Sequence, residues 1–200
     1  MNRDRLESFS DGVIAVAITL LVLNIRVPPP PEPRLGHALG AQWPFYAAYV
    51  TSFLTIGIIW INHHVMINRL ARADHSILIL NLVLLLSIGV IPFATSLLAQ
   101  YLREGQGASL AAGVYGGVFL LMAIAFSTLQ RQILIRRPHL LRAELSLERR
   151  RKLLLRSISG LIPYVVASAL AVVSPYATLA ICAGVAVFYA LPIASEVSEG

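Results

Sequence analysis

The stretch of sequence that decides the fold is SILILNLVLLLSIGVIPFATSLL, residues 76–98. It carries no charged side chain and is about as long as the roughly 20 apolar residues that cross the hydrocarbon core of a bilayer. Similar stretches recur along the chain, and backbone groups inside lipid must be hydrogen-bonded within their own segment. We therefore predict an all-α integral membrane protein with six transmembrane helices, at about residues 11–27, 43–67, 76–98, 109–129, 158–173 and 176–193.

The composition agrees with a membrane protein. Of the 200 residues, 57% are hydrophobic and 13% are charged, against about a quarter charged in a soluble domain. No long polar or Gly/Ser-rich run separates the apolar segments, so we predict one transmembrane domain over residues 1–200. The single cysteine, Cys182, lies in an apolar segment and is expected to be a small core residue.

The basic residues indicate the orientation of the chain in the membrane. The formal charge is +6, but the arginines lie between apolar segments, which indicates topology rather than binding to nucleic acid. If the N-terminus is cytoplasmic, only Arg26, Arg34 and Arg103 of the 16 lysines and arginines lie outside, and the other 13 lie inside. This asymmetry predicts that both termini are cytoplasmic.

Nine of the inner basic residues lie in a predicted loop over residues 131–156. A solvated loop explains such a run of charges, and a helix that contacts anionic lipid headgroups explains it as well. Anionic lipid is therefore a candidate partner of this segment.

Several polar residues are predicted to lie within the membrane at similar depth. Asp11 begins the first segment, and ionisable residues within membrane segments are usually paired and functional. Its candidate partners come from three helices, and the predicted network comprises Arg5, Ser10, Asp11, His63 or His64, and Asn81. The network either fixes the first helix against the second and third or, because histidine titrates near neutral pH, senses protons.

We predict no metal site and no catalytic cluster. Adjacent histidines point about 100° apart on a helix, so His63 and His64 do not easily bind one ion. The sequence contains no phosphate-binding glycine loop and no grouped Ser/His/Asp set.

Two further patterns concern helix packing. Val16, Leu20, Leu23 and Val27 share one face of the first helix, with Thr19 beside them, which on composition alone is ordinary packing. Ser109, Gly113 and Gly117 form a small-residue stripe that permits close helix contact.

Two motifs resemble the transmembrane protein 175 family of potassium channels. The first is Arg5-Leu6-Glu7-Ser8-Phe9-Ser10-Asp11-Gly12, an Arg followed after three residues by Phe-Ser-Asp at the start of the first helix. The second is Trp60-Ile61-Asn62-His63-His64, followed by Arg69, Arg72, Asp74, Asn81 and Pro92-Phe93. The chain carries one six-helix repeat and so is similar to the prokaryotic members, which implies a homotetramer in the plasma (inner) membrane of a prokaryote.

The resemblance implies a potassium-permeable channel with modest preference for K⁺ over Na⁺. Four copies of the first helix would line the pore, and by alignment the apolar constriction falls on Val16, Leu20 and Leu23, with Thr19 beside it. Such a constriction gates by dewetting. Asp11 would then be structural. Other monovalent cations and protons are candidate permeant ions of the same pore, and no cofactor is implied.

Two other classes of function remain open. A proton-coupled secondary transporter would use Asp11 and His63 or His64 as a relay, and it usually shows inverted repeats that are not evident here. A non-transporting membrane scaffold or a small membrane enzyme would produce no ion flux.

Overall fold

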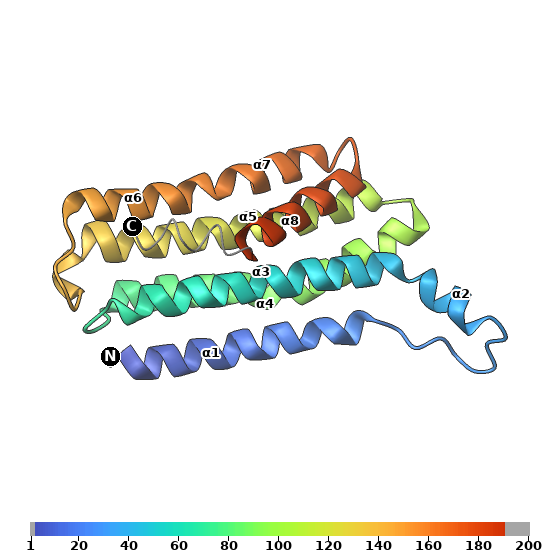
Figure 1. Ribbon diagram of the computed structural model, residues 1–200, viewed down its shortest axis with the longest axis horizontal. Coiled ribbons are helices and arrows are strands. Elements are labelled where there is room, and N and C mark those ends of the chain that lie inside the picture. Colours follow the sequence, from blue (N-terminus) through green and yellow to red (C-terminus); the bar gives the residue numbers. More distant parts are fainter. Residues whose placement is uncertain (1–2, 191–200) are drawn as a thin grey trace.

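The computed structural model describes residues 3–190 as a bundle of roughly antiparallel helices (Figure 1). Apart from one isolated bridge between Leu70 and Leu141, all its regular structure is helical. The α-helices are α1 (Arg3–Leu20), α2 (Leu35–Gly40), α3 (Trp43–Asn68), α4 (His75–Glu104), α5 (Ala108–Arg131), α6 (Leu147–Ser159), α7 (Leu161–Leu170) and α8 (Pro175–Ala190). The short helices are η1 (Leu21–Asn24), η2 (Gln132–Arg136) and η3 (Pro138–Leu140).

Five helical stretches among residues 3–190 are long and apolar enough to cross a membrane: Arg3–Asn24, Trp43–Asn68, His75–Glu104, Ala108–Arg136 and Leu147–Leu170. The prediction of an all-α membrane protein is therefore confirmed. The sixth predicted segment corresponds to α8, which is apolar but shorter. Its last residues, 191–193, lie outside the described part of the chain.

The first helix begins and ends earlier than predicted. It starts at Arg3 rather than near Asp11, because its polar first turns are held by local contacts such as the Ser8 hydroxyl donating to the Asp4 carbonyl at 2.9 Å. The α-helix gives way to the 3₁₀ turn η1, and Ile25 is already extended. The proline run at residues 28–31 explains this end, since prolines cannot continue a helix.

The predicted loop over residues 131–156 is wrong in extent. The fourth membrane helix continues through the π-helical turn η2 to Arg136, and α6 begins at Leu147, so the non-α connection is short. Ser146 caps α6 by accepting a hydrogen bond from the Arg149 N–H at 3.2 Å. Four of the nine basic residues thus lie in the first turns of a helix that runs on toward α7.

Proline acts differently in two helices. Pro92 lies inside α4, which continues without a break. The α6–α7 stretch is interrupted at Gly160, three residues before Pro163. Pro163 has no N–H to donate to the carbonyl of the preceding turn, which explains the interruption.

One end of the bundle collects the basic residues. Figure 1 shows the N-terminus, the α3–α4 turn and the α5–α6 connection at the same end, and α2 at the other. Two backbone hydrogen bonds join the two connections: Ala71 N–H donates to Leu140 O, and Arg142 N–H donates to Arg69 O, both at 2.8 Å. The predicted inner and outer basic residues therefore lie at opposite ends of the molecule.

Close packing between α5 and α7 occurs at Gly116, not at the predicted stripe. A Cβ at Gly116 would lie 2.9 Å from Ser168 Oγ and 3.2 Å from Ser168 Cα. Within the described part of the chain, a Cβ at Gly117 would meet no atom within 4 Å, and one at Gly113 would have the Ala171 Cβ nearest, at 4.0 Å. The small-residue spacing indicated a helix contact, but the close contact within the described chain is at Gly116 rather than at Gly117. The spacing alone does not fix which side of α5 faces α7.

Candidate functional site

Helix α1 lies at the edge of the bundle and has two distinct faces (Figure 1). Its inner face packs against α3 and α4 and buries Leu6, Ser10, Ile14, Ala17 and Leu21. These positions recur every three or four residues, as they must on one side of a helix. The inner face therefore fixes how α1 is rotated against the rest of the chain.

The outer face of α1 is apolar and exposed. The exposed fractions are 53% for Phe9, 58% for Val16, 44% for Leu20 and 74% for Leu23. Gly12 and Thr19 are also exposed, and the Thr19 hydroxyl donates to the Val16 carbonyl at 2.9 Å. All the residues predicted for the constriction thus lie on a face that no other part of residues 3–190 covers.

A buried chain of hydrogen bonds joins α1 to α4 and α3. The Ser10 hydroxyl donates to the Leu6 carbonyl at 2.8 Å, and the Asn81 amide donates to Ser10 Oγ at 2.9 Å. The Asn81 oxygen lies 2.8 Å from His63 Nε2, which must carry the proton to donate to it. Ser10, His63 and Asn81 are all fully buried. The chain links three helices at one depth and holds α1 in one rotation.

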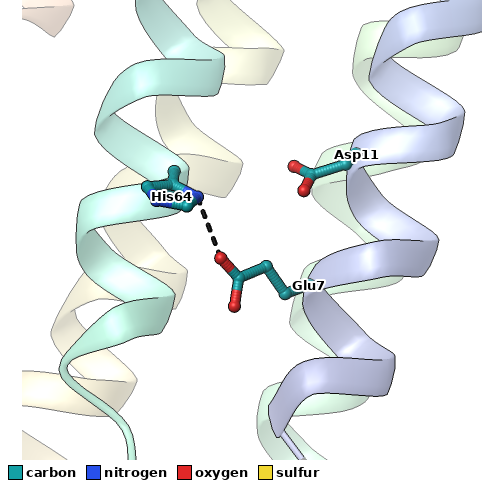
Figure 2. A group of neighbouring side chains, drawn as sticks. All are labelled: Glu7, Asp11 and His64. Atoms are coloured by element: carbon teal, nitrogen blue, oxygen red, sulfur yellow. Dashed lines mark ion pairs between the residues drawn. The ribbon is translucent and has the colours of Figure 1, made fainter.

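A second polar group lies beside the first and is partly exposed (Figure 2). His64 Nδ1 lies 2.9 Å from Glu7 Oε1, and the Trp60 indole N–H donates to Asp11 Oδ1 at 2.9 Å. Figure 2 shows Glu7 and Asp11 projecting from α1 toward His64 on α3. This group also links α1 to α3, but through charged and exposed side chains.

The predicted network is therefore divided into two. His63 belongs to the buried chain with Ser10 and Asn81, whereas His64 belongs to the partly exposed group with Asp11. Arg5 is exposed and makes no hydrogen bond or ion pair with either group within residues 3–190. The functional roles of these residues stay predictions.

Glu7 is the member that sequence reasoning missed. It lies within the first family motif, at residues 5–12, but no role was predicted for it. Its spacing of four residues from Asp11 places both carboxylates on one face of α1, which was a usable signal.

Comparisons with known proteins identify the family. A sequence model of the family described as "Endosomal/lysosomal potassium channel TMEM175" matches residues 5–92, which contain every predicted site residue. A protein of Streptomyces collinus named as a potassium channel is 45% identical over 186 residues, covering 92% of this chain and 90% of that protein. The chain belongs to the TMEM175 family. The predicted resemblance is thereby confirmed.

The TMEM175 fold extends beyond the matched motifs. The crystal structure of a lysosomal potassium-selective channel TMEM175 homolog from Chamaesiphon minutus has a TM-score of 0.83 and 35% identity, covering 99% of this chain and 98% of that one. The mouse endosomal/lysosomal proton channel TMEM175 is 34% identical over 113 residues, covering 52% of this chain and 23% of that protein. TMEM175 proteins are ion channels, so the prediction that the chain is not an enzyme is also confirmed.

Proposed function

We propose that the chain is a potassium-permeable cation channel with modest preference for K⁺ over Na⁺. The observation that carries the proposal is the outer face of α1, which is apolar, exposed and continuous from Phe9 to Leu23. Four copies around a central axis would cover this face and turn it into the wall of a pore. The potassium channel of Streptomyces collinus and the potassium-selective homolog from Chamaesiphon minutus support the choice of ion.

The proposed gate is an apolar constriction at Val16, Leu20 and Leu23. A narrow apolar pore holds water poorly, so small changes in its radius switch it between wet, conducting and dry, closed states. K⁺ sheds its hydration water at lower cost than Na⁺, which gives a modest preference without a ring of carbonyl ligands. The Thr19 hydroxyl offers lone pairs beside the constriction, since its proton is donated to the Val16 carbonyl.

The inner face of α1 supplies the support for this gate. The Ser10–Asn81–His63 chain crosses from α1 to α4 and α3, and its groups have little alternative but to bond one another because they are buried. Rotating α1 would break these bonds. We infer that the chain holds Val16 and Leu20 toward the pore axis.

The proposed topology has six transmembrane helices in one domain, with both termini in the cytoplasm of a prokaryote and α8 as the sixth span. The gathering of basic residues at the end that holds the N-terminus supports it. The first turns of α6, which carry Arg149, Arg151 and Lys152, are the proposed contact with anionic lipid headgroups. Other monovalent cations or protons share the proposed pore, and no cofactor is proposed.

Ion flux in liposomes tests the channel. We expect K⁺ flux to exceed Na⁺ flux for the wild type, and Leu20→Ala with Leu23→Ala to raise the rate and reduce the K⁺/Na⁺ ratio because the constriction widens. The matched control is Leu110→Ala with Leu121→Ala, which removes two exposed leucines from α5 and should leave both quantities unchanged.

Two outcomes would contradict the proposal. The absence of flux from folded protein over a range of pH and voltage would favour a scaffold. Saturable flux that follows a proton gradient and ignores the α1 leucines would favour a transporter.

A further inference from the structure

Three potential metal ligands converge in the gap between α1 and α3 (Figure 2). One oxygen each from Glu7 and Asp11 and one ring nitrogen of His64 lie within 4.8 Å of one another. We propose that these residues bind a divalent transition-metal cation of the Zn²⁺ class, and that the bound ion clamps α1 to α3.

The separations suit a metal after small side-chain adjustments. Zn²⁺ binds imidazole nitrogen and carboxylate oxygen at roughly 2.0–2.2 Å, so any two ligands lie within about 4.4 Å of each other. His64 Nδ1 and Glu7 Oε1 are already 2.9 Å apart. Glu7 and Asp11 are four residues apart on α1, so they reach the ion from successive turns.

The remaining atoms of the three side chains have partners that orient them. The Trp60 indole holds Asp11 Oδ1 at 2.9 Å, and Arg3 Nε lies 3.7 Å from Glu7 Oε2. His64 Nε2 lies 2.9 Å from the Asn68 side-chain amide. A metal on Nδ1 requires the neutral ring to carry its proton on Nε2, and Asn68 can accept that proton through its oxygen once the amide is turned over. Such outer hydrogen bonds are typical of metal ligands.

The donor set favours a transition metal over Mg²⁺ or Ca²⁺. Imidazole suits Zn²⁺ and its neighbours, whereas Mg²⁺ and Ca²⁺ prefer all-oxygen sites. Two carboxylates balance the two positive charges of the ion, and a water molecule completes a four-coordinate site. The sequence argument against a metal concerned two adjacent histidines, and this set uses only His64, since His63 is bound to Asn81.

A metal ion bound at this site would affect conduction, and this inference rests on the proposed pore. Both carboxylates belong to α1, the helix proposed to line the pore, and His64 belongs to α3. A bound ion would join the two helices by covalent-like bonds near the cytoplasmic end and restrict the motion of α1. We expect metal binding to reduce K⁺ flux.

Direct binding tests the site independently of conduction. Zn²⁺ is titrated calorimetrically into the purified full-length protein, and Co²⁺ is followed by its visible absorption as a coordination probe. We expect one saturable site per chain, weakened about tenfold or more in both His64→Gln and Glu7→Gln. The control His75→Gln removes an exposed histidine outside the group and should bind like the wild type.

The results below would overturn the metal site, the channel or the clamp. Equal binding by the wild type and both variants, or no saturable binding by folded wild type, would overturn the site. The elution volume and the metal-free K⁺ flux of each variant report folding, and Asp11→Asn provides a third ligand variant. Normal flux from a wild type that binds no metal would overturn the site alone. Metal binding by a wild type that conducts no ions would overturn the channel alone. Site-dependent metal binding that leaves wild-type flux unchanged would overturn the clamp.

Discussion

At the scale of single residues, the amide of Asn81 has the greatest effect on how α1 is held. It bonds Ser10 on one side and His63 on the other, and all three groups are buried. Asn81→Ala leaves the buried His63 Nε2–H without an acceptor and removes the bond to Ser10, whose hydroxyl keeps the Leu6 carbonyl. An unsatisfied buried group costs about 1–3 kcal/mol. We expect a clearly lower melting temperature in detergent.

The control for this change is Asn62→Ala. Asn62 is exposed, and within residues 3–190 its amide bonds only the Ile58 carbonyl of its own helix, at 2.8 Å. A melting temperature that falls equally in the two variants would mean that the buried chain adds nothing specific to stability.

Asp74 stabilises the start of α4 through its charge. Its Oδ1 accepts from the Ile77 N–H at 2.9 Å, and its Oδ2 lies 3.1 Å from Arg137 Nε. The Ile77 bond, helped by the Ser76 hydroxyl and Arg137 and opposed by burial, places the pKa of Asp74 below its ordinary value of 3.8. Because the folded pKa is the lower one, the charge-dependent stabilisation is complete above pH 3.8 and is lost as the pH falls through the folded pKa.

We therefore expect Asp74→Ala to lower the free energy of unfolding by about 1 kcal/mol at neutral pH, as loss of a helix N-cap does. The difference from the wild type should shrink below pH 3.8. Unfolding measured against pH checks it, with Glu104→Gln, an exposed carboxylate at the far end of α4, as the control. If the difference in free energy of unfolding stayed constant down to acid pH, the charge of Asp74 would not contribute to the stabilisation.

The sequence predicted which residues form the site better than it predicted which of them bond one another. Ser10, Asp11, His63, His64 and Asn81 could be placed at one depth because their positions in successive apolar segments fix how far each lies from the helix end. Which histidine faces which partner depends on the rotation of α3, and one residue changes that by about 100°. The sequence therefore could not separate the buried chain of His63 from the exposed group of His64.

At the scale of helices, Gly116 permits α5 and α7 to approach closely. Gly116→Ala places a methyl group 2.9 Å from Ser168 Oγ and 3.2–3.3 Å from the Ser168 backbone. Overpacking of this kind costs about 1–3 kcal/mol, more than the roughly 1 kcal/mol that alanine gains over glycine in a helix. We expect destabilisation for Gly116→Ala and none for Gly117→Ala, whose new methyl group meets no atom of residues 3–190 within 4 Å.

Thermal unfolding of both alanine variants in the same detergent decides between the two glycines. If Gly117→Ala were the less stable variant, the Ser109–Gly113–Gly117 stripe would be the true contact, and the packing of α5 against α7 described here would be wrong.

The apolar runs of the sequence predicted that the helices exist, but they did not predict where each helix begins and ends. The uncharged stretch at residues 76–98 has no alternative to a membrane helix, and α4 contains it. The end of α1 is set by the prolines after it, and the start of α6 by a single capping serine, Ser146. These local effects are small beside the apolar burial that defines a span, so a pattern based on hydropathy overlooks them.

At the scale of the whole molecule, α1 contacts the bundle on one side only and leaves an apolar face uncovered (Figure 1). If four copies of the chain surround one axis with this face inward, the same residue of neighbouring chains lies close together. Cys182 is the one native cysteine and is buried, so an introduced thiol is the reactive one. We expect Val16→Cys to be joined between chains by a short bismaleimide cross-linker in membranes.

The matched control is Leu121→Cys, an exposed position on α5, which is not the helix proposed to line the pore. Covalent dimers on denaturing gels are expected for Val16→Cys and not for Leu121→Cys. The opposite result would place α5 rather than α1 at the contact between copies. The pore would then have to be lined by another helix, and the flux change expected from Leu20→Ala with Leu23→Ala would disappear with it.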